Sequence, residues 1–94
     1  ELRARMEAGS PPRLIDVRED WEYQKGHIPG SEHLPLSRFI QAYPTLPKNQ
    51  ELVIVCESGS RSGQAAQFLS GQGYGSVHNL VGGMSAWRRG EPRR

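Results

Sequence analysis

The sequence has a single cysteine, Cys56, among its 94 residues. A chain with one cysteine cannot form an internal disulfide, whereas small secreted domains usually depend on several. The chain also lacks an apolar run near the ~20 residues that a membrane-spanning helix needs, and no stretch resembles a secretory signal. We therefore expect a protein of the reducing cytoplasm.

The sequence also lacks a large excess of charge of either sign. Twelve Lys and Arg stand against ten Asp and Glu, and the arginines are scattered apart from RRGEPRR at residues 88–94. Nucleic-acid binding needs a clustered positive face, so nucleic acid is not expected as a partner. Without a membrane-spanning segment, a membrane is not expected as a partner either. The length suits one domain over residues 1–94, and the start on Glu1 leaves room for a missing first strand. The oligomeric state stays open, with a monomer favoured.

Short apolar runs alternate with segments of helical pattern. The clearest strand is ELVIVC at residues 51–56, whose uninterrupted Val53, Ile54 and Val55 suit a strand covered on both faces. Other extended segments are expected at 14–17, 33–36 and 77–80, helices at 1–9, 37–50, 62–74 and 82–90, and a loop with room for one helical turn at 20–31. This alternation predicts an α/β fold with a central, mostly parallel sheet flanked by helices on both faces.

The helix expected over 37–50 carries an apolar face. Phe39, Ile40 and Tyr43 have the spacing of an amphipathic helix, and Pro44 and Pro47 should end it.

Cys56 falls at the carboxyl end of its strand, where open α/β sheets bind their ligands. Four small or flexible residues follow it: Glu57, Ser58, Gly59 and Ser60. They can wrap with successive N–H groups pointing inward, and a helix should begin at about Arg61 or Ser62, which together make an anion site. These donors and Arg61 favour the thiolate, so we predict a lowered Cys56 pKa and a nucleophilic thiol. The alternative is a buried cysteine that acts only as a small hydrophobic residue.

Four stretches in this order resemble a single-domain rhodanese, a thiosulfate sulfurtransferase: LIDVRE at 14–19, EYQKGHIPGSEHLPL at 22–36, VIVCESGSRS at 53–62 and GGMSAWRRGEP at 82–92. The resemblance implies that Cys56 takes a sulfane sulfur from a donor such as thiosulfate, becomes a persulfide, and passes the sulfur to a thiophilic acceptor such as cyanide or a protein thiol. The cradle that binds the substrate would run from Glu57 to Arg61, with Asp16 and Ser62 in support. Neither a metal nor an organic cofactor is implied.

The supporting charges have several expected partners. Asp16 would anchor Arg61 or neighbouring backbone donors, or lie at a solvated strand end. Arg61 is expected to brace the loop through a carboxylate more than to contact substrate. We expect Arg18 to pair with Glu19 or Glu22, or to anchor the loop that follows.

Glu57 departs from the pattern of many active rhodaneses, which carry a basic residue after the cysteine. An acid at the mouth of the pocket would repel a dianionic donor and raise the thiol pKa. Slow turnover of thiosulfate is then expected, and a neutral or protein-bound sulfur donor is favoured more.

Two other classes of function stay open. A catalytically silent rhodanese-like domain would be a binding or sulfur-carrier module, although such domains typically replace the cysteine that this chain keeps. Related cysteine phosphatases place five residues between Cys and Arg, whereas CESGSR has four, and no acid stands out to protonate a leaving alcohol. His27 in the GHIPG turn is not expected to act as a general base, because transfer from a thiolate needs none.

Overall fold

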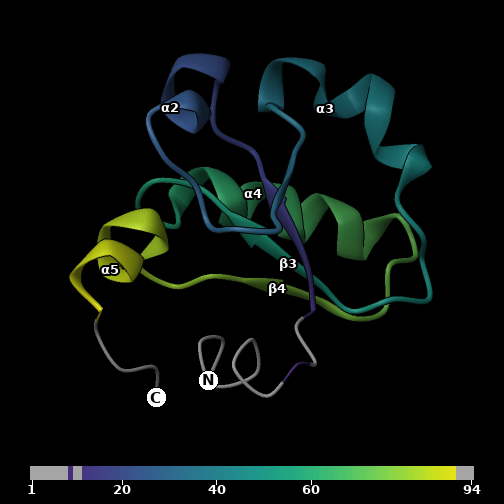
Figure 1. The fold of residues 1–94 in the computed structure, drawn as a ribbon. Coiled ribbons are helices and arrows are strands. Elements are labelled where there is room, and N and C mark those ends of the chain that lie inside the picture. Colours follow the sequence, from purple (N-terminus) through teal and green to yellow (C-terminus); the bar gives the residue numbers. More distant parts are fainter. Residues whose placement is uncertain (1–8, 10–11, 91–94) are drawn as a thin grey trace.

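A computed structural model describes Gly9 and residues 12–90 of the chain (Figure 1). The helix predicted over 1–9 therefore lies, except for Gly9, outside the described residues. The elements in chain order are β1 (Arg13–Asp16), α2 (Asp20–Gln24), β2 (Glu32–His33), α3 (Leu36–Ala42), a 3-10 turn (Tyr43–Thr45), β3 (Leu52–Val55), α4 (Ser60–Gly71), β4 (Val77–Asn79) and α5 (Gly83–Arg89).

The four strands form one parallel sheet with the order β2-β1-β3-β4. The central strands β1 and β3 pair along their whole length, ending with Asp16 opposite Val55. At the edge, Asn79 of β4 lies opposite Ile54 of β3. The α/β fold and the parallel sheet predicted from the sequence are confirmed.

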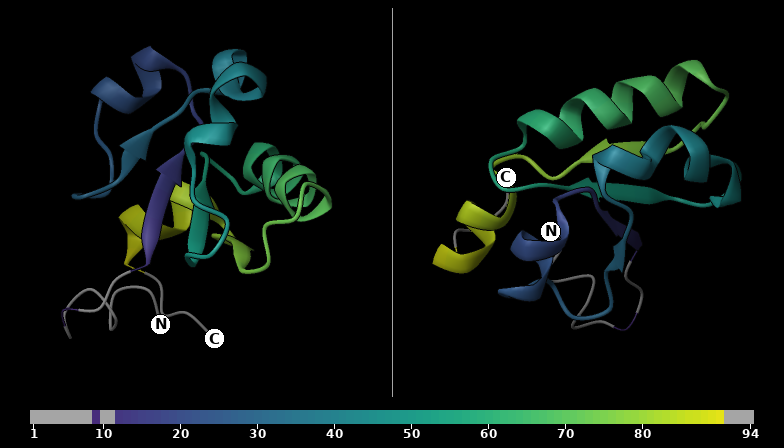
Figure 2. Two further views of the ribbon diagram at one scale, coloured as in Figure 1. Left: turned by 90° about the vertical axis from the view of Figure 1, so that its right-hand side faces the viewer. Right: turned by 90° about the horizontal axis from the view of Figure 1, so that it is seen from above.

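Helices cover both faces of this sheet, as predicted, with α4 on one side and α5 on the other (Figure 2). Successive side chains of β3 point to opposite faces of the sheet. Leu52 and Ile54 pack in the core formed with α3 and α4, and Val53 and Val55 pack in the core formed with α5. All four are buried, and each such side chain contributes about 1.5–3 kcal/mol to stability. An unbroken apolar strand is therefore required here.

The helix α3 lies in the segment predicted over 37–50 and ends before Pro44, as the prolines of that segment predicted. It ends at Ala42 and passes into the 3-10 turn that contains Pro44. A proline has no N–H to donate, and its ring clashes with the carbonyl four residues earlier, so the α-helix stops. Phe39 is buried, but Ile40 is 61% exposed and does not share its face, because adjacent residues of a helix point about 100° apart.

Candidate active site

The carboxyl ends of β1, β3 and β4 lie at the same edge of the parallel sheet (Figure 1). Asp16 ends β1, Asn79 ends β4, and Cys56 follows the last residue of β3. This is the edge at which α/β proteins bind ligands.

The residues after Cys56 wind around its sulfur. Gly59 precedes α4 with a φ of 102°, a left-handed conformation that favours glycine. Its N–H donates to the Cys56 Sγ, with 3.1 Å between the two atoms. The Ser62 hydroxyl oxygen lies 3.2 Å from the same sulfur. The helix begins at Ser60, slightly earlier than predicted.

Burial and hydrogen bonding act in opposite directions on the Cys56 thiol. Its side chain is fully buried, and burial raises the pKa because a thiolate there loses hydration. The Ser62 hydroxyl and the N–H groups of Ser62, Gly59 and Ser58 lower the pKa, because they donate to the charged form. The donors together outweigh burial, so the pKa lies below its ordinary value. This is the direction predicted from the loop, whereas the rise expected from Glu57 does not prevail.

The first turn of α5 holds the cysteine loop from outside. The N–H of Met84 donates to the Cys56 carbonyl oxygen at 2.9 Å, and the N–H of Ser85 donates to the Glu57 carbonyl oxygen at 3.0 Å. In a trans peptide the N–H points away from the C=O. Because the Glu57 carbonyl faces α5, the N–H of the same peptide, which belongs to Ser58, points away from α5.

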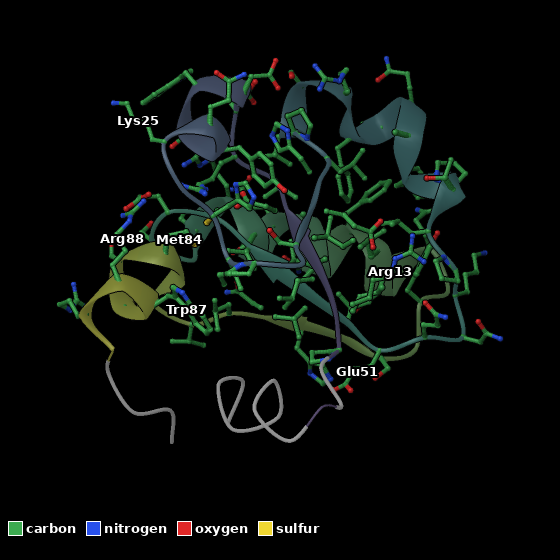
Figure 3. All side chains as sticks on the ribbon, in the orientation of Figure 1. Arg13, Lys25, Glu51, Met84, Trp87 and Arg88 are labelled. Carbon is green, nitrogen blue, oxygen red and sulfur yellow. The ribbon has the colours of Figure 1, made fainter. Side chains whose placement is uncertain are left out.

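This close approach depends on glycine at the start of α5. Gly83 has a φ of 56°, and a Cβ at this position would lie 2.4 Å from the Cys56 carbonyl oxygen and 2.6 Å from that of Glu57. Met84 and Trp87 pack α5 against the sheet, and Figure 3 shows them on the helix with Arg88. The loop and α5 therefore form one packed unit.

Arg61 braces the loop through α2. Its Nη1 and Nη2 donate to the two carboxylate oxygens of Glu22, each at 2.8 Å. These hydrogen bonds lower the Glu22 pKa to about 2, although burial works against them. The pKa of Arg61 is raised, mainly by Glu22 and also by the negative charge of Cys56. Pairing with a carboxylate agrees with the prediction, but the partner is Glu22 and not Asp16.

Asp16 pairs instead with Arg18, and both side chains are buried. The carboxylate accepts from the Arg18 backbone N–H at 3.0 Å and from its Nη2 at 2.9 Å. Arg18 Nη2 also donates to the Gly26 carbonyl oxygen at 2.8 Å, so it anchors the following loop, which is one of its predicted roles. The expectation that its ion-pair partner is Glu19 or Glu22 is wrong, because the buried guanidinium lies on Asp16.

Glu57 is surrounded by donors and cations. Its carboxylate accepts from Arg88 Nη1 at 2.6 Å and from the Ser85 hydroxyl at 3.0 Å, and Arg18 Nη1 lies 3.5 Å away. The bonds from Arg88 are the main reason that the Glu57 pKa is lowered. A cavity of about 260 Å³ adjoins this cluster, lined by Arg18, Trp21, Glu22, Lys25, Glu57 and Arg88. Glu57 lines this cavity, and neighbouring arginines offset its charge.

His27 is bound to the loop that carries it. Its ring stacks on Tyr23, with 3.8 Å between ring centroids, and its Nδ1 lies 3.0 Å from the Tyr23 carbonyl oxygen. His33 stacks on the other side of Tyr23 at 4.2 Å. These contacts tie His27 to Tyr23 in the loop.

Comparison with known proteins decides the family. A family model described as Rhodanese-like domain matches residues 1–89. The chain belongs to the rhodanese-like family. The resemblance noted in the sequence is therefore confirmed, and this rhodanese-like domain carries its cysteine loop at the expected strand end.

Relatives of this rhodanese-like domain are named for sulfur transfer or sulfur carriage. A protein of Allochromatium vinosum named sulfurtransferase is 43% identical over 76 residues, which cover 81% of this chain and 71% of that protein. YrkF of Bacillus subtilis, provisionally named a sulfur carrier protein, is 39% identical over 86 residues; these cover 92% of this chain and only 46% of YrkF. A rhodanese-like domain protein from Staphylococcus aureus superposes with a TM-score of 0.86 at 32% identity, over 93% of this chain and 84% of its own.

Asn79 completes the site of this rhodanese-like domain and was not singled out from the sequence. Its Nδ2 donates to the Gly59 carbonyl oxygen at 2.9 Å, and its Oδ1 accepts from the Ser62 hydroxyl. The available signal was a polar residue near the carboxyl end of the VHNL segment, which in a parallel sheet ends beside the cysteine loop.

Within Gly9 and residues 12–90, no helix is long and apolar enough to cross a bilayer. The same residues contain no cluster of three His, Cys, Asp or Glu side chains that could hold a metal ion.

Proposed function

We propose that this domain is a sulfurtransferase that moves a sulfane sulfur through a persulfide on Cys56. The observation that carries the proposal is the convergence of the Gly59 N–H and the Ser62 hydroxyl on a single buried sulfur. Such donors favour an anionic sulfur, which is both a good nucleophile and a good leaving group. The reaction needs these two properties in turn, and it needs neither a metal nor an organic cofactor.

Two displacements make up the reaction. The Cys56 thiolate attacks the outer sulfur of thiosulfate, the S–S bond of the donor breaks, and sulfite leaves with its electron pair. A thiophilic acceptor such as cyanide, or a protein thiolate, then attacks the outer sulfur of the persulfide. Cys56 leaves as the thiolate, so no proton has to be transferred by a general base.

The loop residues have separate roles in this scheme. The backbone N–H of Gly59 stabilises negative charge on the sulfur, because it is already aimed at it, and the N–H of Ser58 also lowers the Cys56 pKa. Ser60 begins α4 and places the helix N-terminus beside the site. Arg61 adds positive charge while Glu22 holds it.

Asp16 and Ser62 support the loop without contacting substrate. Asp16 acts through Arg18, whose guanidinium reaches Glu57. We further propose that the domain works in the cytoplasm with a small or protein-bound sulfur donor and acceptor, and with neither nucleic acid nor a membrane.

The charge of Glu57 provides a prediction about donor choice. We expect Glu57→Gln to raise kcat/KM for thiosulfate roughly fivefold, because a unit charge near a surface acts on an anion with about 1 kcal/mol. Glutamine keeps the size of the side chain and can still accept from Ser85 and Arg88. Steady-state kinetics at low and high salt measure the effect, which should shrink with salt because exposed charges are screened beyond about 8–10 Å.

Arg88→Gln is the matched control for this prediction. It removes one of the cations that offset Glu57, so it should slow the reaction with thiosulfate. A neutral sulfane donor should respond little to either change. If Glu57→Gln accelerated both donors equally, or if its effect ignored salt, Glu57 would act through loop conformation and not through charge.

A second candidate is a sulfur carrier that is loaded by another protein. The acidic residue after Cys56 favours it, because Glu57 paired with Arg88 attracts a free dianionic donor less than a basic residue in its place would. The name of the relative YrkF points in the same direction. Such a carrier would form the same persulfide from a protein persulfide and would react poorly with thiosulfate.

Intact mass spectrometry tests the proposal. After incubation with thiosulfate the protein should gain the mass of one sulfur atom, and cyanide should remove it with formation of thiocyanate. Loading from a protein persulfide or polysulfide but not from thiosulfate would select the carrier. If none of these donors added sulfur, or if the chain hydrolysed aryl phosphates efficiently, the sulfurtransferase assignment would be wrong.

A further inference from the structure

The Ser62 hydroxyl faces two acceptors and has one hydrogen to donate. Its oxygen lies 3.2 Å from the Cys56 sulfur and also forms a hydrogen bond with Asn79 Oδ1. Ser62 is fully buried, so its partners are the groups around it and not bulk water. The hydroxyl can donate to the sulfur or to the amide oxygen, but not fully to both.

The other end of the Asn79 amide fixes its orientation. Nδ2 donates to the Gly59 carbonyl oxygen at 2.9 Å, and a carbonyl can only accept. Oδ1 must therefore face Ser62. The helix α4 packs closely here, since a Cβ on Gly63 would lie 3.3 Å from Asn79 Nδ2. Asn79 thus offers Ser62 an acceptor and never a donor.

We propose that Asn79 is a positioning residue for the Cys56 sulfur. Asn79 accepts the hydrogen bond of the Ser62 hydroxyl while Cys56 is a thiol, and it loses this hydrogen bond to the sulfur when the sulfur becomes an anion. In the thiol, S–H donates to the Ser62 oxygen, whose own hydrogen lies on Asn79 Oδ1. When the thiol proton passes to solvent, the hydroxyl turns and donates to the sulfur, and Oδ1 loses its donor. No other bond forms or breaks. The inference rests on the proposed function, in which the anionic sulfur attacks the donor.

Asn79 therefore opposes the anion through Ser62, while its Nδ2 helps to hold the loop. The effect of Asn79 on the Cys56 titration has a defined direction. An acceptor that keeps the hydrogen bond of the hydroxyl leaves the anionic sulfur without it. The charged groups near the loop are Arg61 on α4, Glu22 on α2, Asp16 and Arg18 at the end of β1, Glu57 in the loop and Arg88 on α5. The substitutions below leave all of them in place.

A cycle of four proteins tests this inference: the parent, Asn79→Leu, Ser62→Ala and the double variant. Leucine is close to asparagine in size and removes both ends of the amide. The chain has one cysteine, so the ultraviolet absorbance of the thiolate, after subtraction of the Cys56→Ser spectrum, reports Cys56 alone. We expect Asn79→Leu to lower the titration midpoint by about half to one pH unit relative to its effect in the Ser62→Ala background. This corresponds to roughly three- to tenfold more thiolate below the midpoint.

The cycle separates the competition from a general loosening of the loop. Loss of the hydrogen bond from Asn79 to the Gly59 carbonyl shifts the titration equally in the parent and in the Ser62→Ala background, so this contribution cancels in the cycle. The coupling that remains comes from the hydrogen of the Ser62 hydroxyl. Equal shifts in the two backgrounds, or a coupling of the opposite sign, would overturn the inference. Circular dichroism checks that each protein is folded, and Asn79→Ala takes the place of Asn79→Leu in the same cycle if the leucine variant is not.

The titration requires no turnover, so the two proposals fail separately. A protein that shows the expected coupling but never acquires sulfur would contradict the proposed function. A protein that acquires sulfur but shows no coupling would contradict only the role of Asn79.

Discussion

Replacing Cys56 with serine should abolish sulfur loading and lower the rate of sulfur transfer by at least about a thousandfold. A serine hydroxyl is not ionised near neutral pH, and its oxygen cannot form a stable persulfide. The fold should survive, because the new oxygen inherits the Gly59 N–H and the Ser62 hydroxyl as hydrogen-bond partners. Intact mass and thiocyanate production measure the loss, and thermal unfolding should show a stability change within about 1 kcal/mol.

The double variant Cys56→Ser with Ser70→Cys is the matched control. Ser70 is exposed on α4, so this protein again carries one thiol, but without the donors of the loop. It should load sulfur from thiosulfate far more slowly than the parent. Parental activity in Cys56→Ser would show that another group is the nucleophile, and parental loading at residue 70 would show that the loop contributes nothing.

Gly83→Ala should be among the most damaging single-methyl additions in the described part of the chain. The new Cβ would press on the carbonyl oxygens of Cys56 and Glu57, and the residue would keep a left-handed φ of 56°. Strain of this kind and overpacking together cost about 3 kcal/mol. For a domain of this size the melting temperature should fall by roughly 10–20 °C. Sulfur loading should fall as well, because the carbonyls must move and the Ser58 N–H moves with them.

Gly30→Ala separates the two causes. Gly30 also has a positive φ, of 87°, but a Cβ there would meet nothing within 4 Å. It should show the conformational cost alone, of about 1 kcal/mol, with sulfur loading unchanged. Equal stability of the Gly83→Ala and Gly30→Ala variants would mean that α5 does not press on the loop as described.

The fold followed from the sequence wherever a local pattern had one physical solution. Val53, Ile54 and Val55 form an unbroken apolar run, and such a run needs cover on both faces, which predicts a parallel sheet between helices. The glycine before α4 and the small residues around it likewise predict a donor loop. Helix geometry also explains why Ile40 does not share the buried face of Phe39, since adjacent helical residues point in different directions. The predicted apolar face included both residues.

The partners within the site could not be predicted, because they depend on how distant segments meet. Arg61 and Glu22 are far apart in the chain, and several carboxylates stood at comparable distances in the sequence. Only the fold, which brings Glu22 of α2 to Arg61 in the first turn of α4, selects this pair and leaves Asp16 for Arg18. Asn79 depends on the register between β3 and β4, which places it opposite Ile54 and next to the cysteine loop.

The hydrogen bonds from α5 to the loop make local opening of the last helix an event at the active site. A seven-residue helix held by Met84, Trp87, a few backbone bonds and the side-chain bonds to Glu57 should detach at a lower free energy than the whole domain unfolds. Each detachment releases the carbonyls of Cys56 and Glu57, and the peptides that aim N–H groups at the sulfur become free to rotate. The amide hydrogens of Met84 and Ser85 should therefore exchange with solvent at a rate that follows the population of the open form, in which the sulfur has lost its alignment.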